Sequence, residues 1–277
     1  MDPVTSLTTI TNQITYWITL LLILGLSLGG VFGLIYIALL LIKNRNREII
    51  SLEMILLEIQ VPRENEIKID AAEQMFASLY AIYSSGWKMK FNPQPHISFE
   101  IVGKKEDIRF YIAVPKDLQD LVEKQIYGAY PAAIVTEVDE YNIFSQHGKV
   151  AFENLYLDSE SYKPIKVYKD LPTDPLSLIT ATMAKMGDDE GCVIQILISP
   201  ANSSWSDKGK SYISTTKKNE SDPEKANYNV DPKTYDAIEN KCSKPGFHTV
   251  IRIVVSSTDL TRAKMHLNNL TGAFQQF

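Results

Sequence analysis

Residues 14–42, ITYWITLLLILGLSLGGVFGLIYIALLLI, contain no charged side chain. About 20 apolar residues are enough for a helix to cross a hydrocarbon core about 30 Å thick. Most of the run is Leu, Ile, Val or Phe, and each of these favours insertion by roughly 0.3 to 0.6 kcal/mol. The run therefore predicts a transmembrane helix over 14–42. A cleaved signal peptide is not expected, because its apolar core is shorter and follows positive charges, whereas Asp2 is the only charge before this run.

The charges beside this run predict its orientation. Lys43, Arg45 and Arg47 follow it directly, and positive residues favour the cytoplasmic side. We therefore expect a single-pass protein of the inner (cytoplasmic) membrane, with an extracytoplasmic tail at 1–13, a basic linker at 43–53 and a cytoplasmic body. Cys192 and Cys242, which have no CxxC partner, fit a reducing compartment.

Gly25, Gly29 and Gly33 recur at every fourth position of the predicted helix. Such a row lets two membrane helices approach closely, so it predicts helix–helix contact. Glycine is also simply common in membrane helices, and that explanation stays open.

Residues 54–138 predict a first α+β unit of the ferredoxin-like (split βαβ) kind. Strands are expected at 54–61, 97–102, 108–114 and 133–138, and in the middle two apolar and polar residues alternate, as in a strand with one buried face. Helices are expected after Asp70 and over 115–131, where apolar residues fall on one stripe. A five-residue turn at 103–107 joins the middle strands into a hairpin.

After a connection at 139–162, which contains a possible extra strand at 150–157, residues 163–277 predict a second ferredoxin-like unit. Its strands are expected at 164–170, 192–200 and 247–255, with helices capped by Asp174 and Asp259. An insert at 201–246 interrupts it and is expected to be a flexible loop with a short helix near 232–240. The last strand of the unit is missing, so a central strand becomes an open edge. Either a strand from elsewhere covers this edge or the chain continues, and we expect the second.

No motif in the sequence predicts catalysis, a cofactor or a metal. The segment ending in Gly209, Lys210 and Ser211 imitates a phosphate-binding loop, but Ser204 stands where that loop needs glycine, and no helix is expected after Ser211. The four histidines, His96, His147, His248 and His266, are scattered without ligand spacing. GDDEG, residues 187–191, is expected to be a solvated acidic turn. Insert lysines Lys208, Lys210, Lys217 and Lys218 are balanced by nearby acids, and the net charge of −5 argues against direct nucleic-acid binding.

Residues 61–82, 96–131, 164–200 and 270–277 carry a family resemblance. They resemble the N-terminal membrane-anchored region of type IV secretion or conjugative-transfer ATPase-like proteins of uncultured bacteria with small genomes, a region usually catalogued as a domain of unknown function. In that family a P-loop ATPase domain that moves DNA or protein typically follows. The resemblance implies a position beside such a motor, and it assigns no catalytic residue to this chain.

Two functions are therefore expected as alternatives. The first is a non-enzymatic scaffold held in the lipid bilayer, which associates with itself or with a secretion or conjugation ATPase. The second is a membrane-bound sensor that binds a small ligand between its two α+β units.

Overall fold

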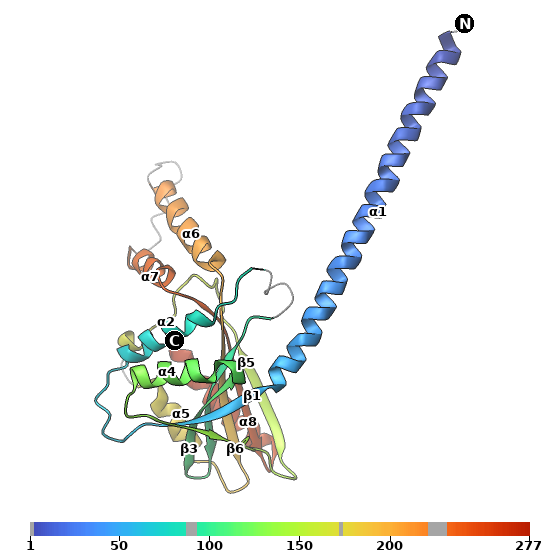
Figure 1. Cartoon of the computed structure of the whole chain (residues 1–277). Helices are drawn as coiled ribbons and strands as arrows, with labels where there is room; N and C mark the ends of the chain where they lie inside the picture. Colours follow the sequence, from blue (N-terminus) through green and yellow to red (C-terminus); the bar gives the residue numbers. More distant parts are fainter. Residues whose placement is uncertain (1–2, 87–92, 172–173, 221–231) are drawn as a thin grey trace. The chain divides into compact units, whose positions relative to one another are not determined.

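The computed structural model describes residues 3–86, 93–171, 174–220 and 232–277 (Figure 1). The chain divides into two compact units, one made of residues 1–52 and 85–93 and the other of residues 53–84 and 94–277. The first unit contains helix α1 (Pro3–Leu52), and the second contains a β-sheet with its helices. Each unit is described by itself.

Helix α1 is longer than the predicted transmembrane segment at both ends. Its part from Gln13 to Arg45 is long and apolar enough to cross a membrane, and no residue of its most apolar stretch is buried. The hydroxyls of Thr19 and Ser27 donate to carbonyls of the preceding turn, at 2.8 Å to Tyr16 and 2.9 Å to Leu24. These polar groups are therefore satisfied within the helix, as a lipid environment requires. The expected tail and basic linker are helical from Pro3 to Leu52.

The second unit is built on one seven-stranded sheet in which every neighbouring pair is antiparallel. The strands follow the order β4-β1-β3-β2-β6-β7-β5. Their bounds are β1 (Met54–Gln60), β2 (Ile97–Lys104), β3 (Asp107–Pro115), β4 (Ile134–Val138), β5 (Lys149–Leu155), β6 (Gly191–Pro200) and β7 (Phe247–Ser257). The predicted α+β class is confirmed.

Four helices cover one face of this sheet, and the 3-10 turns η1 (Tyr80–Ile82), η2 (Lys116–Leu118) and η4 (Ala273–Gln276) adjoin three of them. They are α2 (Asp70–Leu79), α4 (Gln119–Ala129), α5 (Pro175–Met183) and α8 (Leu260–Gly272). Asp174 and Asp259 cap α5 and α8 as predicted, accepting from the backbone N–H groups of Leu176 and Arg262.

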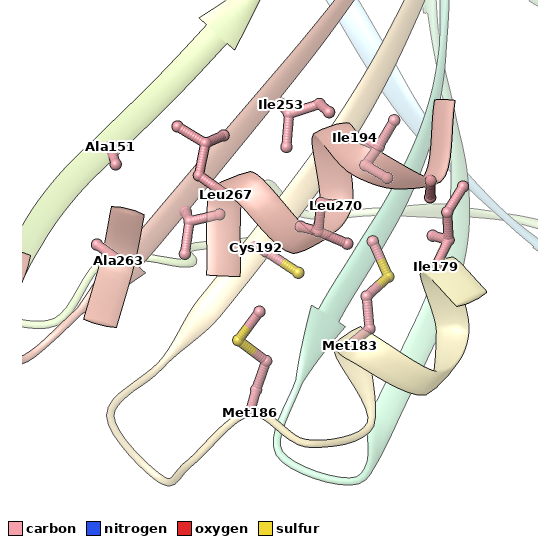
Figure 2. Close-up of a cluster of buried hydrophobic side chains, with 12 residues drawn as sticks. Ala151, Ile179, Met183, Met186, Cys192, Ile194, Ile253, Ala263, Leu267 and Leu270 are labelled. Atoms are coloured by element: carbon pink, nitrogen blue, oxygen red, sulfur yellow. The ribbon is translucent and has the colours of Figure 1, made fainter. Parts of the chain in front are cut away.

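The core lies between these helices and the sheet as two adjoining clusters. One joins α2 and α4 to β1, β2 and β3 around Leu57, Leu79 and Val122. The other joins α5 and α8 to β6 and β7, and Figure 2 shows Met183, Cys192 and Leu270 within it. Ile196 of β6 packs against both clusters, so the two halves share one core.

The first half, β1 to β4, follows the element order that the sequence predicts. In the second half the expected strand at 164–170 is wrong. Residues 168–170 form the 3-10 turn η3 (Tyr168–Asp170), and Ile165 and Val167 are each about half exposed. The strand beside β7 is instead β5, which lies at the place given as a possible extra strand. Both segments contain β-branched and aromatic residues typical of strands, but only one position beside β7 is free for a strand.

The hairpin turn between β2 and β3 is shorter than predicted. Lys104 pairs with Asp107, so the turn consists of Lys105 and Glu106, and Glu106 has a φ of 55°. Gly103 is therefore a strand residue. A Cβ at this position would lie 2.8 Å from the Cβ of Met183 in α5 and 3.1 Å from the sulfur of Cys192. Its missing side chain lets α5 approach the sheet.

The expected flexible insert contains two helices, α6 (Ser204–Glu220) and α7 (Pro232–Cys242). Only the second was predicted. The helices pack on each other around Ile213, Tyr235, Ile238 and Cys242. This small cluster stabilises a helix in α6, whose own composition does not favour one. Residues 221–231, between the helices, lie outside the described residues.

We expect Gly103→Ala to lower the free energy of unfolding by about 1 to 3 kcal/mol, the usual cost of overpacking a core. Thermal unfolding of the whole chain in mild detergent measures this. Gly128→Ala is the matched control, because nothing lies within 4 Å of its Cβ position on α4. That change should leave the protein unchanged or slightly more stable. Equal effects of both changes would contradict this account of Gly103.

Candidate functional site

The predicted glycine row lies on an open face of α1. No atom lies within 4 Å of a Cβ placed at Gly25, Gly29 or Gly33, outside the helix's own neighbouring backbone. A shallow apolar groove runs along this face, lined by Ile18, Leu21, Leu22, Gly25, Leu26, Gly29 and Gly30. Within the described residues no element fills it. Its shape suits the close approach of a second helix.

The residues predicted to set the orientation lie at the C-terminal end of this apolar stretch. Lys43 and Arg45 belong to α1, Lys43 half-buried and Arg45 exposed. Arg47 belongs to the same helix, and its side chain lies outside the described ones. Near the other end, Tyr16 and Trp17 pack edge to face with ring centroids 6.0 Å apart. Basic and aromatic residues thus flank the stretch, as is typical of membrane helices.

A buried carboxylate, Glu100, lies on the sheet face opposite the helices. It accepts hydrogen bonds from Ser98 at 2.7 Å, from Gln195 at 2.9 Å and from the Tyr141 hydroxyl at 2.5 Å. Burial raises the pKa of Tyr141, and its bond to Glu100 raises it further. Tyr141 belongs to the connection between β4 and β5, and Gln195 to β6. Glu100 therefore fastens this connection and the second half of the sheet to β2.

A second buried carboxylate, Glu190, lies just before β6. Ser257 donates to it at 2.6 Å, the backbone N–H of Gly187 at 2.8 Å and Arg262 at 3.0 Å, while a nitrogen of His266 lies 3.3 Å away. Burial by itself would raise the pKa of Glu190, but these hydrogen bonds and the His266 charge together lower it to about 2. The carboxylate is thus held ionised, and it ties the start of β6 to the end of β7 and to α8.

Sequence reasoning missed this cluster, and its interpretation of 187–191 as a solvated turn is wrong for Glu190. Asp188 is exposed and pairs with Lys105, whereas the Glu190 side chain is 3% exposed. Arg262 and His266 are four residues apart and share a helix face. Their spacing is a weak signal for an acidic partner, and the sequence does not name that partner.

A groove of about 710 Å³ runs between α5 and α8 beside this cluster. Its lining consists of Leu178, Ala181, Thr182, Lys185, Arg262, Met265, His266, Asn268, Asn269 and Gly272. The groove lies in the helix layer that covers the second half of the sheet. Between the two halves, β2 and β6 are paired along their length, so the expected sensor cleft does not lie between those strands.

The residues that imitate a phosphate-binding loop do not form one. Gly209, Lys210 and Ser211 lie inside α6 rather than in a loop before a helix. His147 is exposed, and His248 is a residue of β7. Among the described residues, no group of three or more His, Cys, Asp or Glu side chains could hold a metal. Burial raises the pKa of the Cys192 thiol to about 12 and also raises that of Cys242, so neither provides a reactive thiolate at neutral pH.

The DUF8128 family, described as a domain of unknown function, matches residues 46–277. The chain therefore belongs to this family. The matched region contains the whole sheet and its helices, together with the C-terminal end of α1. No curated protein matches the chain.

We expect Glu190→Gln to lower the free energy of unfolding by about 2 kcal/mol at pH 7, because the hydrogen bonds from Ser257, Gly187 and Arg262 lose their charged acceptor. The pKa of Glu190 lies below its ordinary value of 4.5, so its stabilisation is present above about pH 4.5 and is lost as the pH falls toward 2. The difference between wild type and variant should shrink over this range in thermal unfolding. Asp188→Asn, at an exposed position, should show little difference at any pH.

Proposed function

We propose that this member of the DUF8128 family is a non-catalytic assembly module anchored in a membrane by α1. The observation that carries the proposal is the apolar surface of α1, since no residue of its most apolar stretch is buried. Leu26, Phe32 and Leu34 are each about 70% exposed. A contiguous apolar surface of this size marks contact with lipid or protein. A bilayer would cover the whole length of the stretch, which is long enough to span it.

The basic residues at the end of this stretch support a cytoplasmic body. Lys43, Arg45 and Arg47 follow the apolar residues, and Asp2 is the only charge before them. Under the positive-inside rule the N-terminus lies outside and the sheet lies in the cytoplasm. In a bacterium this makes the protein a single-pass component of the inner membrane.

The polar clusters of the body support a structural role. The carboxylates of Glu100 and Glu190 each accept hydrogen bonds from several groups of the chain itself. Catalytic groups need a polar atom that can reach a substrate. Both carboxylates instead join strands and helices that are distant in the sequence, as a rigid scaffold requires.

The partner that we propose is a motor ATPase of type IV secretion or conjugative transfer, beside further copies of this chain. The resemblance of residues 61–82, 96–131, 164–200 and 270–277 to the anchored region of such ATPase-like proteins supports the motor. The open glycine row of α1 supports self-association. Holding copies of a motor at one membrane site is the function that combines these features.

Membrane anchoring predicts that the full chain stays with the membrane pellet after washes with salt and alkaline carbonate, and that detergent releases it. Replacing Leu24 and Leu28 together by Asp should shift it to the soluble or aggregated fraction, since each Asp costs about 3 kcal/mol of insertion. The control replaces the same two residues by Ile. If the wild-type chain is freely soluble after a salt wash without detergent, the proposed function is wrong.

Self-association through α1 predicts that a bulky side chain in the glycine row weakens the association between copies. Gly29→Leu should weaken association of the full chain in detergent micelles about tenfold or more, because the added side chain keeps two backbones apart. Val31→Leu adds bulk on the opposite side of the helix and should have no effect. Energy transfer between donor- and acceptor-labelled copies measures both. Equal association of the two variants would exclude contact through the glycine row.

A further inference from the structure

Strand β5 forms one edge of the sheet (Figure 1). It pairs with β7 from Lys149 to Leu155, and within the described residues no strand pairs with its other side. In an antiparallel sheet, alternate residues of an edge strand direct their N–H and C=O groups away from the single neighbour. These groups are a template for another strand.

The two halves of the sheet differ at this position. In the first half, β1 lies between β3 and β4. In the second half, β5 precedes a helix, as β1 does, and pairs with β7, as β1 pairs with β3. The place that β4 takes beside β1 is not filled beside β5 by any described residue. By analogy with β4 beside β1, the outer side of β5 is the position at which a further strand would add.

The side chains of β5 are exposed and partly apolar. Val150 and Phe152 point to the sheet face opposite the helices and are 43% and 69% exposed. Lys149 and Glu153 are exposed on the other face, while Ala151 between them is buried. Tyr156, directly after the strand, is 82% exposed. Edge strands are normally protected against pairing, and a large exposed phenylalanine does not protect one.

We propose that β5 is a self-association surface, on which β5 of a second copy adds antiparallel with the two-fold axis at Ala151. In this register Lys149 of each copy faces Glu153 of the other. Val150 of each copy then faces Phe152 of the other, on the opposite sheet face. Directly opposite residues of antiparallel strands have Cβ atoms about 4.5 to 5.5 Å apart, close enough for both kinds of pair. The contact is isologous, so it closes as a dimer.

Charge complementarity identifies a second copy of this chain as the partner that pairs with the open side of β5. The register about Ala151 forms two opposite-charge pairs and two apolar pairs from one short strand. The next register, with the axis at Phe152 and every partner shifted by two residues, would place Glu153 opposite Ala151 and Lys149 opposite Leu155, without a charge pair. The other sheet edge, β4, carries Glu137 as its only charge, so a second copy of β4 offers it no opposite charge.

This inference rests on the proposed assembly function and deepens it. The glycine row of α1 supplies one contact between copies, and the β5 edge supplies a separate contact between their bodies. The two contacts involve different units of the chain, so variants affect them separately.

Charge reversal on the full chain in detergent micelles tests the proposed register. Lys149→Glu and Glu153→Lys should each weaken self-association about tenfold, since each turns two attractive cross-strand pairs into repulsive ones. The double change Lys149→Glu with Glu153→Lys should restore association to within about twofold. Lys124→Glu, at an exposed position on α4, is the control and should have no effect. Failure of the double variant to recover, with every single variant folded, overturns the register.

Disulfide trapping provides a second readout that does not depend on charge. A chain with Val150→Cys and Phe152→Cys should form a covalent dimer on mild oxidation, because the new cysteines face each other across the two-fold axis. The control carries Ile134→Cys and Thr136→Cys on β4 and should form no covalent dimer under the same oxidation. Trapping through β4 but not β5 would overturn the proposal, as would trapping through neither.

The outcomes separate this inference from the proposed function. If Gly29→Leu abolishes association while all β5 variants associate as the wild type does, the β5 contact is wrong and the membrane module stands. If the β5 variants weaken association and Gly29→Leu does not, the β5 contact stands without the glycine row. A wild-type chain that stays monomeric at every concentration in micelles overturns both contacts.

Discussion

The pairing of β2 with β6 is the interaction on which the body depends. These strands form eight residue pairs, from Ile97 with Ile198 to Lys104 with Gly191. Without this ladder the body would be two small sheets, each with its own unpaired edge. Side chains reinforce the ladder on both faces. Ile196 packs into both core clusters on the helix side, and Gln195 donates to Glu100 on the opposite side. The two halves are therefore parts of one sheet and one core, and a partner bound to one half is rigidly connected to the other.

Most of this sheet could be predicted from local patterns, because alternation of apolar and polar residues directly reports which face is buried. Alternation does not report which strands pair. Residues 164–170 and 149–155 both contain β-branched and aromatic residues typical of strands, and the choice between them is made by the single free position beside β7. The prediction for the insert was wrong for a related reason. The sequence of α6 has low helix propensity, and contacts of Ile213 and Trp205 with α7 stabilise its helix. Tertiary packing overrode the local preference at both places.

The candidate sites also differ in whether they depend on local sequence or on the fold. The glycine row and the basic flank of α1 are local in sequence, so spacing alone identified them. The Glu190 cluster is not local, because Ser257 and Arg262 lie 67 and 72 residues away. Only the fold brings these donors to one carboxylate. Glu190 stands beside two acidic residues in a turn. The composition of this turn did not indicate that one of its three carboxylates is buried while the other two are solvated.

In the proposed function, the membrane anchor lowers the affinity that the body needs for self-association. Two copies joined through their membrane helices meet again at an effective concentration set by the tether, which reaches millimolar values for short connections. An edge of seven residues with two charge pairs gives a weak contact on its own, because exposed charge pairs are worth about 1 kcal/mol or less. A weak edge has an advantage for such a protein. In the proposed assembly, this edge would be too weak to link free copies before membrane insertion, and strong enough to order them once the tether holds them together.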